Sequence, residues 1–201
     1  MSFRLVSSGE NTRYYGFGAG SLRDTWNEIK RLGPLDDNGE RFPAAADHKV
    51  ELRNIRIDAL ATRTGSGGST AFSAEASITQ GGLEYGFAFV FPLWRNVANL
   101  SSRVRAEWER FIGRLWVHER GHKTVAIPII QQYHTQYENL RGQGAGGSSS
   151  VAETDAIDNL QAQLQPLMDQ LTAALDQASA SYDTSTRHGA TQGAELNMNS
   201  R

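Results

Sequence analysis

Apolar residues near the start of the chain recur three or four positions apart, which is the spacing of a helix. Residues 21–32 (SLRDTWNEIKRL) carry such a stripe, and Gly33-Pro34 follows it. Ser21 is a favourable N-cap residue, and a glycine followed by a proline ends a helix. The pattern therefore predicts a short helix over residues 21–32.

Between residues 49 and 91 apolar and polar positions alternate, which is the spacing of β-strands. Three segments fit this pattern, at 49–62, 72–79 and 83–91. Glycine-rich sequences separate them, at 65–68 and at Gly81-Gly82, and glycine pairs are typical of tight turns. We therefore expect an antiparallel meander of three strands with one buried face.

The second half of the chain returns to the helical period in two long stretches. One begins near residue 101, with Pro128 expected to end or kink it, and the other covers about 151–183. Between them, residues 142–150 (GQGAGGSSS) have the composition of a flexible linker. These elements predict an α+β fold, in which the meander packs on the first long helix and on a second C-terminal helix.

Composition and charge narrow the classes of protein that this sequence fits. Its 201 residues suit one domain over 1–194, and we expect 195–201 to be a disordered tail. The net charge of −2 provides no global basic field for binding nucleic acid. The absence of cysteine excludes a thiol nucleophile and cysteine-ligated zinc. The sequence has no apolar run long enough for a membrane span, and its first residues lack the pattern of a signal peptide.

The sequence His118-Glu119-Arg120-Gly121-His122 lies inside the first long helix and carries the candidate chemistry. Residues four positions apart lie on one face of a helix, so both imidazoles can ligate one Zn²⁺. Glu119 lies beside them and can take a proton from a metal-bound water. We therefore predict a zincin-like HExxH helix, with two ordinary histidines on a helix face as the plain alternative.

Two histidines leave such a site incomplete, because catalytic zinc usually has three protein ligands and a water. The position six residues after His122 is Pro128, and His134 and Glu138 can reach the metal only if the helix breaks sharply. The end of the second long helix offers a further cluster: Tyr182, Asp183, Arg187 and His188. A helix end with a pair of cations facing its dipole would explain that cluster without any metal.

Together these motifs resemble a bacterial domain-of-unknown-function family whose members are predicted to be secreted zinc-dependent proteases of the zincin clan. The resemblance spans most of the chain and rests on motifs near its start, middle and end: Tyr14-Tyr15-Gly16, Gly20 and Gly33-Pro34; Trp108, Phe111 and the HExGH sequence; and the pattern YDxxTxHGxxQG over 182–193. The chain departs from that family in lacking a signal peptide, so its location stays open.

The resemblance implies a zinc metalloprotease that acts on a peptide or protein substrate. His118 and His122 are the implied zinc ligands, and Glu119 is the implied general base. Two other classes of function stay open at this point. One is a non-catalytic zincin-fold domain that binds or supports a partner, and the other is a helical interaction module built on residues 151–183.

The resemblance also implies roles for the C-terminal cluster. We prefer His188 as the third zinc ligand, because a neutral imidazole completes a common three-histidine site. Asp183 is the alternative ligand, and its carboxylate could instead orient a ligating imidazole. Tyr182 and Arg187 are the candidates for stabilising the oxyanion of a tetrahedral intermediate.

Overall fold

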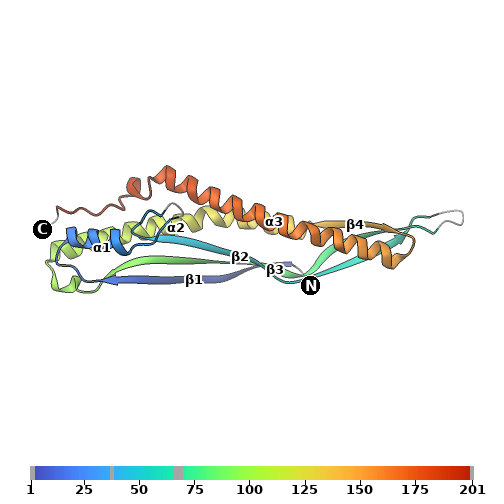
Figure 1. Cartoon of the computed structure of the whole chain (residues 1–201), viewed down its shortest axis with the longest axis horizontal. Helices are drawn as coiled ribbons and strands as arrows, with labels where there is room; N and C mark the ends of the chain where they lie inside the picture. The colour runs from blue at the N-terminus through green and yellow to red at the C-terminus, as the bar shows by residue number, and fades with distance from the viewer. Residues whose placement is uncertain (1–2, 37–38, 66–69, 200–201) are drawn as a thin grey trace. The chain divides into compact units, whose positions relative to one another are not determined.

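A computed structural model describes residues 3–36, 39–65 and 70–199, and over these ranges it has an α+β fold, as expected (Figure 1). The elements, in chain order, are β1 Phe3–Phe17, α1 Leu22–Leu32, β2 Ala45–Arg63, β3 Phe72–Trp94, α2 Ser102–Glu138, β4 Arg141–Gly146 and α3 Ser149–Thr186. Short 3₁₀ turns lie at Val97–Asn99 and Ala190–Gln192. Among the described residues, no helix combines the length and the apolar character that a membrane span requires.

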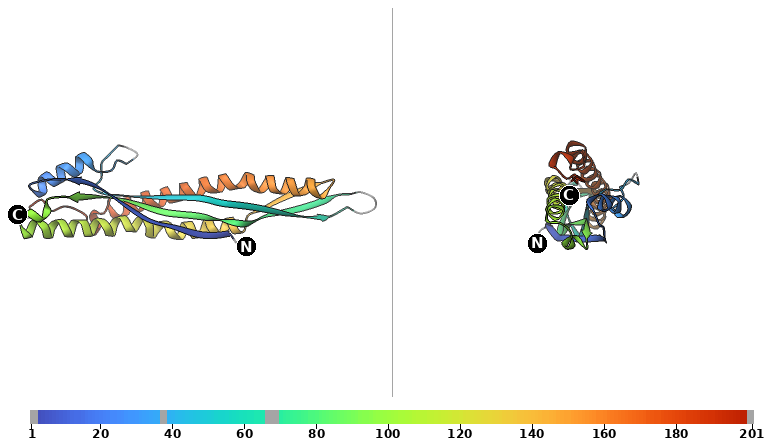
Figure 2. Two further views of the ribbon diagram at one scale, coloured as in Figure 1. Left: turned by 90° about the horizontal axis from the view of Figure 1, so that it is seen from below. Right: turned by 90° about the vertical axis from the view of Figure 1, so that its left-hand side faces the viewer.

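The sheet has four strands, and in the order β1-β3-β2 strand β3 lies between β1 and β2 (Figure 2). It differs from the predicted meander in two respects. Residues 3–17 form a strand that sequence analysis missed, because few of their side chains are buried and the apolar alternation is weak. The strands expected at 72–79 and 83–91 are one strand, β3.

The pair Gly81-Gly82 serves close packing within β3 rather than a turn. A Cβ at Gly81 would lie 2.8 Å from the Arg53 carbonyl oxygen, and one at Gly82 would lie 2.6 Å from the Arg4 carbonyl oxygen. Both glycines therefore allow neighbouring backbone to approach more closely than a side chain would permit. The glycine-rich turn expected at 65–68 falls largely outside the described residues.

The flexible linker expected at 142–150 is also a regular element. Strand β4 pairs antiparallel with β3, from Phe72 opposite Gly146 to Ser77 opposite Arg141. Its glycines lie against α3: a Cβ at Gly142 would overlap the Ala156 carbonyl oxygen. Side chains of α3 also bind the backbone of β4, through Asp155, Asn159 and Gln163. Glycine is required here by close contact with a helix, which composition alone does not distinguish from flexibility.

Contacts group the chain into two compact units, each made of three segments. The first unit comprises Met1–Ser8, Val50–Tyr85 and Ile127–Asp176. The second comprises Gly9–Lys49, Gly86–Ala126 and Gln177–Arg201. Every residue proposed for zinc binding or catalysis lies in the second unit.

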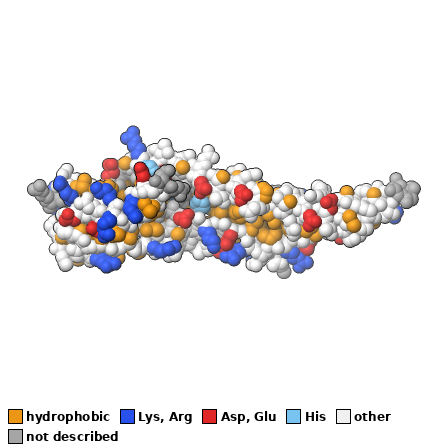
Figure 3. All heavy atoms as spheres, viewed as in Figure 1, with side chains coloured by type: hydrophobic (Ala, Val, Ile, Leu, Met, Phe, Trp, Pro, Cys, Tyr) orange, Lys and Arg blue, Asp and Glu red, His pale blue; other side chains and the backbone are white. Residues whose placement is uncertain are grey.

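Charged side chains of both signs share the surface. On the face seen in Figure 3, Lys and Arg side chains are interspersed with Asp and Glu.

In the second unit, an aromatic core positions the HExxH part of α2 against the sheet. The rings of Phe91 and Trp116 stack with centroids 4.0 Å apart, and Phe17 meets Trp108 edge to face at 6.2 Å. Phe111 is fully buried in the same unit. This packing fixes one face of α2, so the residues on another face are free to form a site.

Candidate metal centre

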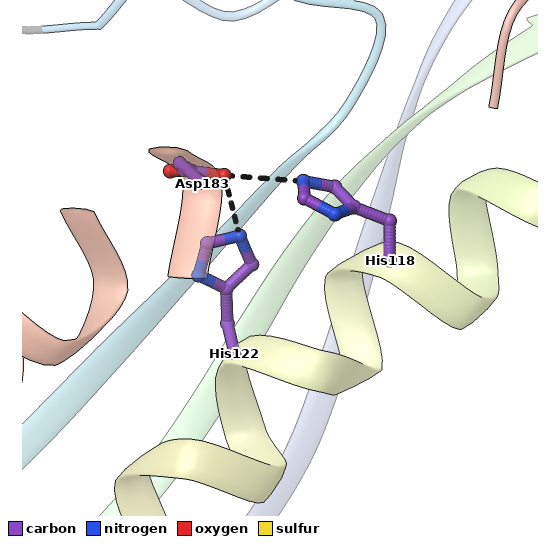
Figure 4. A group of neighbouring side chains, drawn as sticks. All are labelled: His118, His122 and Asp183. Atoms are coloured by element: carbon purple, nitrogen blue, oxygen red, sulfur yellow. Dashed lines mark ion pairs between the residues drawn. The ribbon is translucent and has the colours of Figure 1, made fainter. Parts of the chain in front are cut away.

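His118, His122 and Asp183 come together from two helices (Figure 4). His118 and His122 lie one turn apart on α2, and Asp183 lies near the end of α3. The Nε2 atoms of the two imidazoles are each 3.2 Å from Asp183 Oδ1. The potential ligand atoms of the three residues all lie within 4.8 Å of one another.

Two of the three separations between these ligand atoms suit a tetrahedral zinc site. Zinc binds imidazole nitrogen and carboxylate oxygen at about 2.0–2.2 Å, so two donors of a tetrahedral site lie about 3.3–3.5 Å apart. Both histidine-to-aspartate distances, at 3.2 Å, are close to that separation. The two nitrogens and one oxygen could therefore hold a divalent metal ion and leave one position for water.

The ring of His118 is held in one orientation by Gln192. His118 Nδ1 lies 3.1 Å from Gln192 Oε1, while Gln192 Nε2 donates to the Tyr182 hydroxyl at 2.8 Å. Because the amide nitrogen is engaged by Tyr182, the amide oxygen accepts from Nδ1–H of His118. With a metal ion bound, that tautomer would leave the lone pair of Nε2 for the metal.

His122 has an equivalent partner in Ser179, whose hydroxyl lies 2.8 Å from His122 Nδ1. Ser179 belongs to a set of α3 residues that share one helix face, with spacing of three, one and three: Ser179, Tyr182, Asp183 and Thr186. Sequence analysis missed Ser179 and did not assign a role to Gln192. The periodicity of that face is the signal that could have identified Ser179.

Tyr182 packs against both histidines, and Gly121 makes room for it. Its ring is stacked on that of His118 at 5.3 Å and meets that of His122 nearly edge-on at 4.9 Å. A Cβ at Gly121 would overlap the Tyr182 hydroxyl oxygen. The glycine inside HExGH therefore has a packing role, because any side chain there would displace the tyrosine.

We expect Gly121→Ala to lower the free energy of unfolding by about 1–3 kcal/mol, the usual cost of overpacking. Gly113→Ala is the matched control, because Gly113 lies on the same helix with nothing within 4 Å of its added Cβ. That substitution should raise stability by roughly 0.5–1 kcal/mol, the gain of alanine over glycine in a helix. Denaturant unfolding of both variants measures the difference. A gain of stability in both would show that Tyr182 does not pack over Gly121.

Electrostatics differ sharply between the two acids of the site. Burial raises the pKa of Glu119 to about 7, although the neighbouring His118 and His122 lower it. Burial also acts to raise the pKa of Asp183, but hydrogen bonds from the two histidines hold it well below its ordinary value. Asp183 is thus ionised and could serve as a metal ligand, whereas Glu119 can exchange a proton near neutral pH.

His188 lies beside this group without belonging to it. Its Nδ1 atom is 3.7 Å from Asp183 Oδ1, its ring packs on Phe42 at 4.8 Å, and 54% of its side chain is exposed. The structure therefore brings the alternative ligand, Asp183, to the histidine pair in place of the preferred His188. Arg187 is exposed, and its side chain makes no hydrogen bond or ion pair within the described part of the chain.

The other histidine and glutamate weighed as ligands belong to a different environment. His134 and Glu138 lie in the first compact unit, where His134 stacks on Phe3 at 5.3 Å. His134 Nδ1 and Glu138 Oε2 are 3.6 Å apart. Helix α2 continues through Pro128 without ending. In the described chain, therefore, no break in α2 folds His134 and Glu138 back towards His118 and His122.

Comparison with known proteins places the chain in a family. The family model of DUF922, described as a bacterial protein of unknown function, matches residues 12–189. The chain belongs to this family. No curated protein and no solved structure matched it. The DUF922 match includes His118, His122 and Asp183 and establishes a bacterial family, but it assigns no activity, zincin relationship or location.

Proposed function

We propose that this DUF922 protein is a zinc-dependent peptidase whose metal is held by His118, His122 and Asp183. The observation that carries the proposal is the convergence of two imidazole Nε2 atoms on one carboxylate oxygen, each 3.2 Å away. The HExxH sequence supplies a buried carboxylate, Glu119, next to this group. In this proposal Asp183 replaces His188 as the third ligand, and the fold is a zincin-like one.

The chemistry divides between the metal and the protein. A zinc ion at this position supplies a Lewis acid and lowers the pKa of a bound water towards about 7. Glu119 accepts a proton from the attacking water and returns it to the leaving amine, so the peptide C–N bond breaks without net consumption of acid or base. Its raised pKa, about 7, suits a group that must do both near neutrality.

In this proposal two side chains stabilise charge on the substrate carbonyl oxygen. The Tyr182 hydroxyl accepts a hydrogen bond from Gln192, which leaves its own proton available for donation. His188 is half exposed beside Asp183 and offers a second donor at the rim of the site. Oxyanion donors of this kind contribute about 10²–10³ in rate when they are correctly aimed.

An edge strand of the sheet begins near the candidate metal centre. Strand β2 lies at the edge of the sheet, and Phe42, which packs on His188, lies just before β2 begins at Ala45. We propose that substrate adds along the β2 edge as a further strand, because sheet edges bind extended peptides in this way. Phe42 then lines one wall of the binding region.

The test is zinc content together with hydrolysis of an unfolded protein such as labelled casein. We expect about one zinc per purified chain by elemental analysis, loss of hydrolysis on chelation, and recovery when zinc is added back. Zinc without hydrolysis of casein or of a mixed peptide library would support the non-catalytic alternative. A folded chain that takes up no zinc after reconstitution would exclude the metal centre itself.

A further inference from the structure

Residues near the C-terminus are hydrogen-bonded to a pair of charged side chains on α2. Glu107 and Arg110 lie one turn apart on α2 and form two hydrogen bonds with each other, Nε to Oε2 at 2.8 Å and Nη2 to Oε1 at 2.7 Å. Glu107 is buried, with 8% of its surface exposed. We call this pair the clamp and residues 193–197 the strap.

Backbone atoms at both ends and in the middle of the strap form hydrogen bonds with the clamp. Arg110 donates to the carbonyl oxygens of Gly193 at 2.7 Å and Glu195 at 2.5 Å. Glu107 Oε1 accepts from the backbone N–H of Asn197 at 2.7 Å. These contacts use alternate residues. Within the tail that sequence analysis expected to be disordered from residue 195, Glu195 and Asn197 thus make specific backbone contacts with the clamp.

Packing secures the residues between those contacts. Ala194 and Leu196 are buried, with 7% and 9% of their surfaces exposed. Buried Ala194 and Leu196 alternate with exposed Glu195 and Asn197, so the two apolar side chains are buried while the backbone is bound to the clamp. Hydrogen bonds to a charged guanidinium or carboxylate are stronger than those between neutral groups. The strap is therefore anchored independently of the candidate metal centre.

Gln192, the residue that orients His118, directly precedes the strap. It ends a single 3₁₀ turn, Ala190–Gln192, flanked by Gly189 and Gly193, both in the left-handed region with φ of 84° and 79°. The turn is fixed at its start because Gly189 lies against the His118 ring: a Cβ at Gly189 would lie 3.0 Å from His118 Cγ. It is fixed at its end by the bond from Arg110 to Gly193.

We infer that Glu107 and Arg110 are positioning residues for the metal centre, acting through the strap on Gln192 and so on the orientation of His118. This inference rests on the proposed metal site. The inference is based on the hydrogen bonds that Glu107 and Arg110 form with each other and with the strap. Releasing the strap frees one end of the turn that carries Gln192. His118 Nδ1 then loses the nearer of its two partners and keeps only the Thr186 hydroxyl, 3.5 Å away.

A double-mutant cycle on zinc affinity distinguishes positioning from general stability. Gln192→Ala should weaken zinc binding about 10–100-fold, as loss of a partner to a ligating histidine usually does. Arg110→Ala should weaken it within the same range, and the double variant should be no weaker than Gln192→Ala alone. Arg103→Ala, which removes an exposed arginine of the same helix, should have no effect. Additive losses, or unchanged affinity in Arg110→Ala, would overturn the inference.

A second variant and a zinc-free measurement complete the test. Arg110→Lys keeps a charge beside buried Glu107 but lacks the guanidinium fork that reaches two carbonyls, so it should also lower affinity while the chain stays folded. In zinc-free protein, the Nδ1–H proton of His118 should be visible by nitrogen-edited NMR in wild type and lost in both Arg110 variants. A wild type with this signal but no zinc binding would exclude the proposed function alone. An unchanged signal in Arg110→Lys and Arg110→Ala would exclude the clamp alone.

Discussion

The Glu119→Gln variant is expected to bind zinc as wild type does and to lose hydrolysis by about 10²–10⁴-fold, the range that general acid–base catalysis contributes. Glutamine has nearly the same shape but cannot accept a proton from water. Glu119 is outside the group of His118, His122 and Asp183, so the metal should be retained. Zinc content and casein hydrolysis, measured on the same preparation, give both quantities.

Glu109→Gln is the matched control, because Glu109 is an exposed glutamate on the same helix. It should retain both zinc and activity. Wild-type rates in Glu119→Gln would show that another group takes the proton. Loss of zinc in Glu119→Gln would instead make Glu119 part of the structural support of the site.

The same variant carries a prediction about stability. Because burial raises the pKa of Glu119 to about 7, its protonated form is favoured in the folded, metal-free chain. This contribution to stability is complete below the ordinary pKa of about 4.5 and is lost as pH rises through 7. Metal-free wild type should therefore lose roughly 3 kcal/mol relative to Glu119→Gln over that pH range. Equal pH profiles for the two proteins would contradict a buried carboxylate.

The part of the site that lies on α2 was predictable from sequence because its pattern is local. A helical period places His118 and His122 on one face whatever the rest of the chain does. The partner carboxylate of Asp183 lies more than sixty positions away, and no local pattern specifies which residues of the C-terminal cluster face α2. Resemblance to a family identified the cluster, but the choice between Asp183 and His188 depended on side-chain direction.

That direction follows from where α3 ends. Asp183 lies within the helix, on the face it shares with Ser179, whereas His188 lies beyond the end at Thr186. Arg187 and His188 have left-handed backbone conformations, with φ of 51° and 49°, and Gly189 continues the turn. Non-glycine residues rarely adopt this region, so the sequence gives no indication of the turn at Arg187 and His188. This turn places His188, beyond the helix, at the exposed rim of the site.

Glycine is the residue whose role is hardest to interpret from this sequence. Gly81-Gly82 and residues 142–150 predict a turn and a linker because glycine favours both. In each case the missing side chain instead allows backbone from a neighbouring strand or helix to approach closely. Composition records that a side chain is absent, but only the three-dimensional contacts reveal whether the space is used for bending or for packing.

Zinc content should separate Asp183 from His188 as the third ligand. We expect Asp183→Ala to lose stoichiometric zinc, because only two neutral imidazoles would remain and their shared partner would be gone. His188→Ala should keep about one zinc per chain, since its Nδ1 is 3.7 Å from Asp183 Oδ1 and its side chain is half exposed. Asp158→Ala, at an exposed position of the same helix, is the control and should bind zinc normally.

Each other result of that experiment has a distinct meaning for function. Zinc lost with His188→Ala but kept with Asp183→Ala would restore the three-histidine site, with Asp183 as a partner that orients an imidazole. Zinc lost with both would indicate four protein ligands, and a closed site of that kind is structural rather than catalytic. Zinc lost with Asp183→Ala alone, combined with reduced hydrolysis in His188→Ala, would assign His188 to the substrate. This result and the three-histidine result both leave a coordination position open for water beside Glu119, as peptide hydrolysis requires.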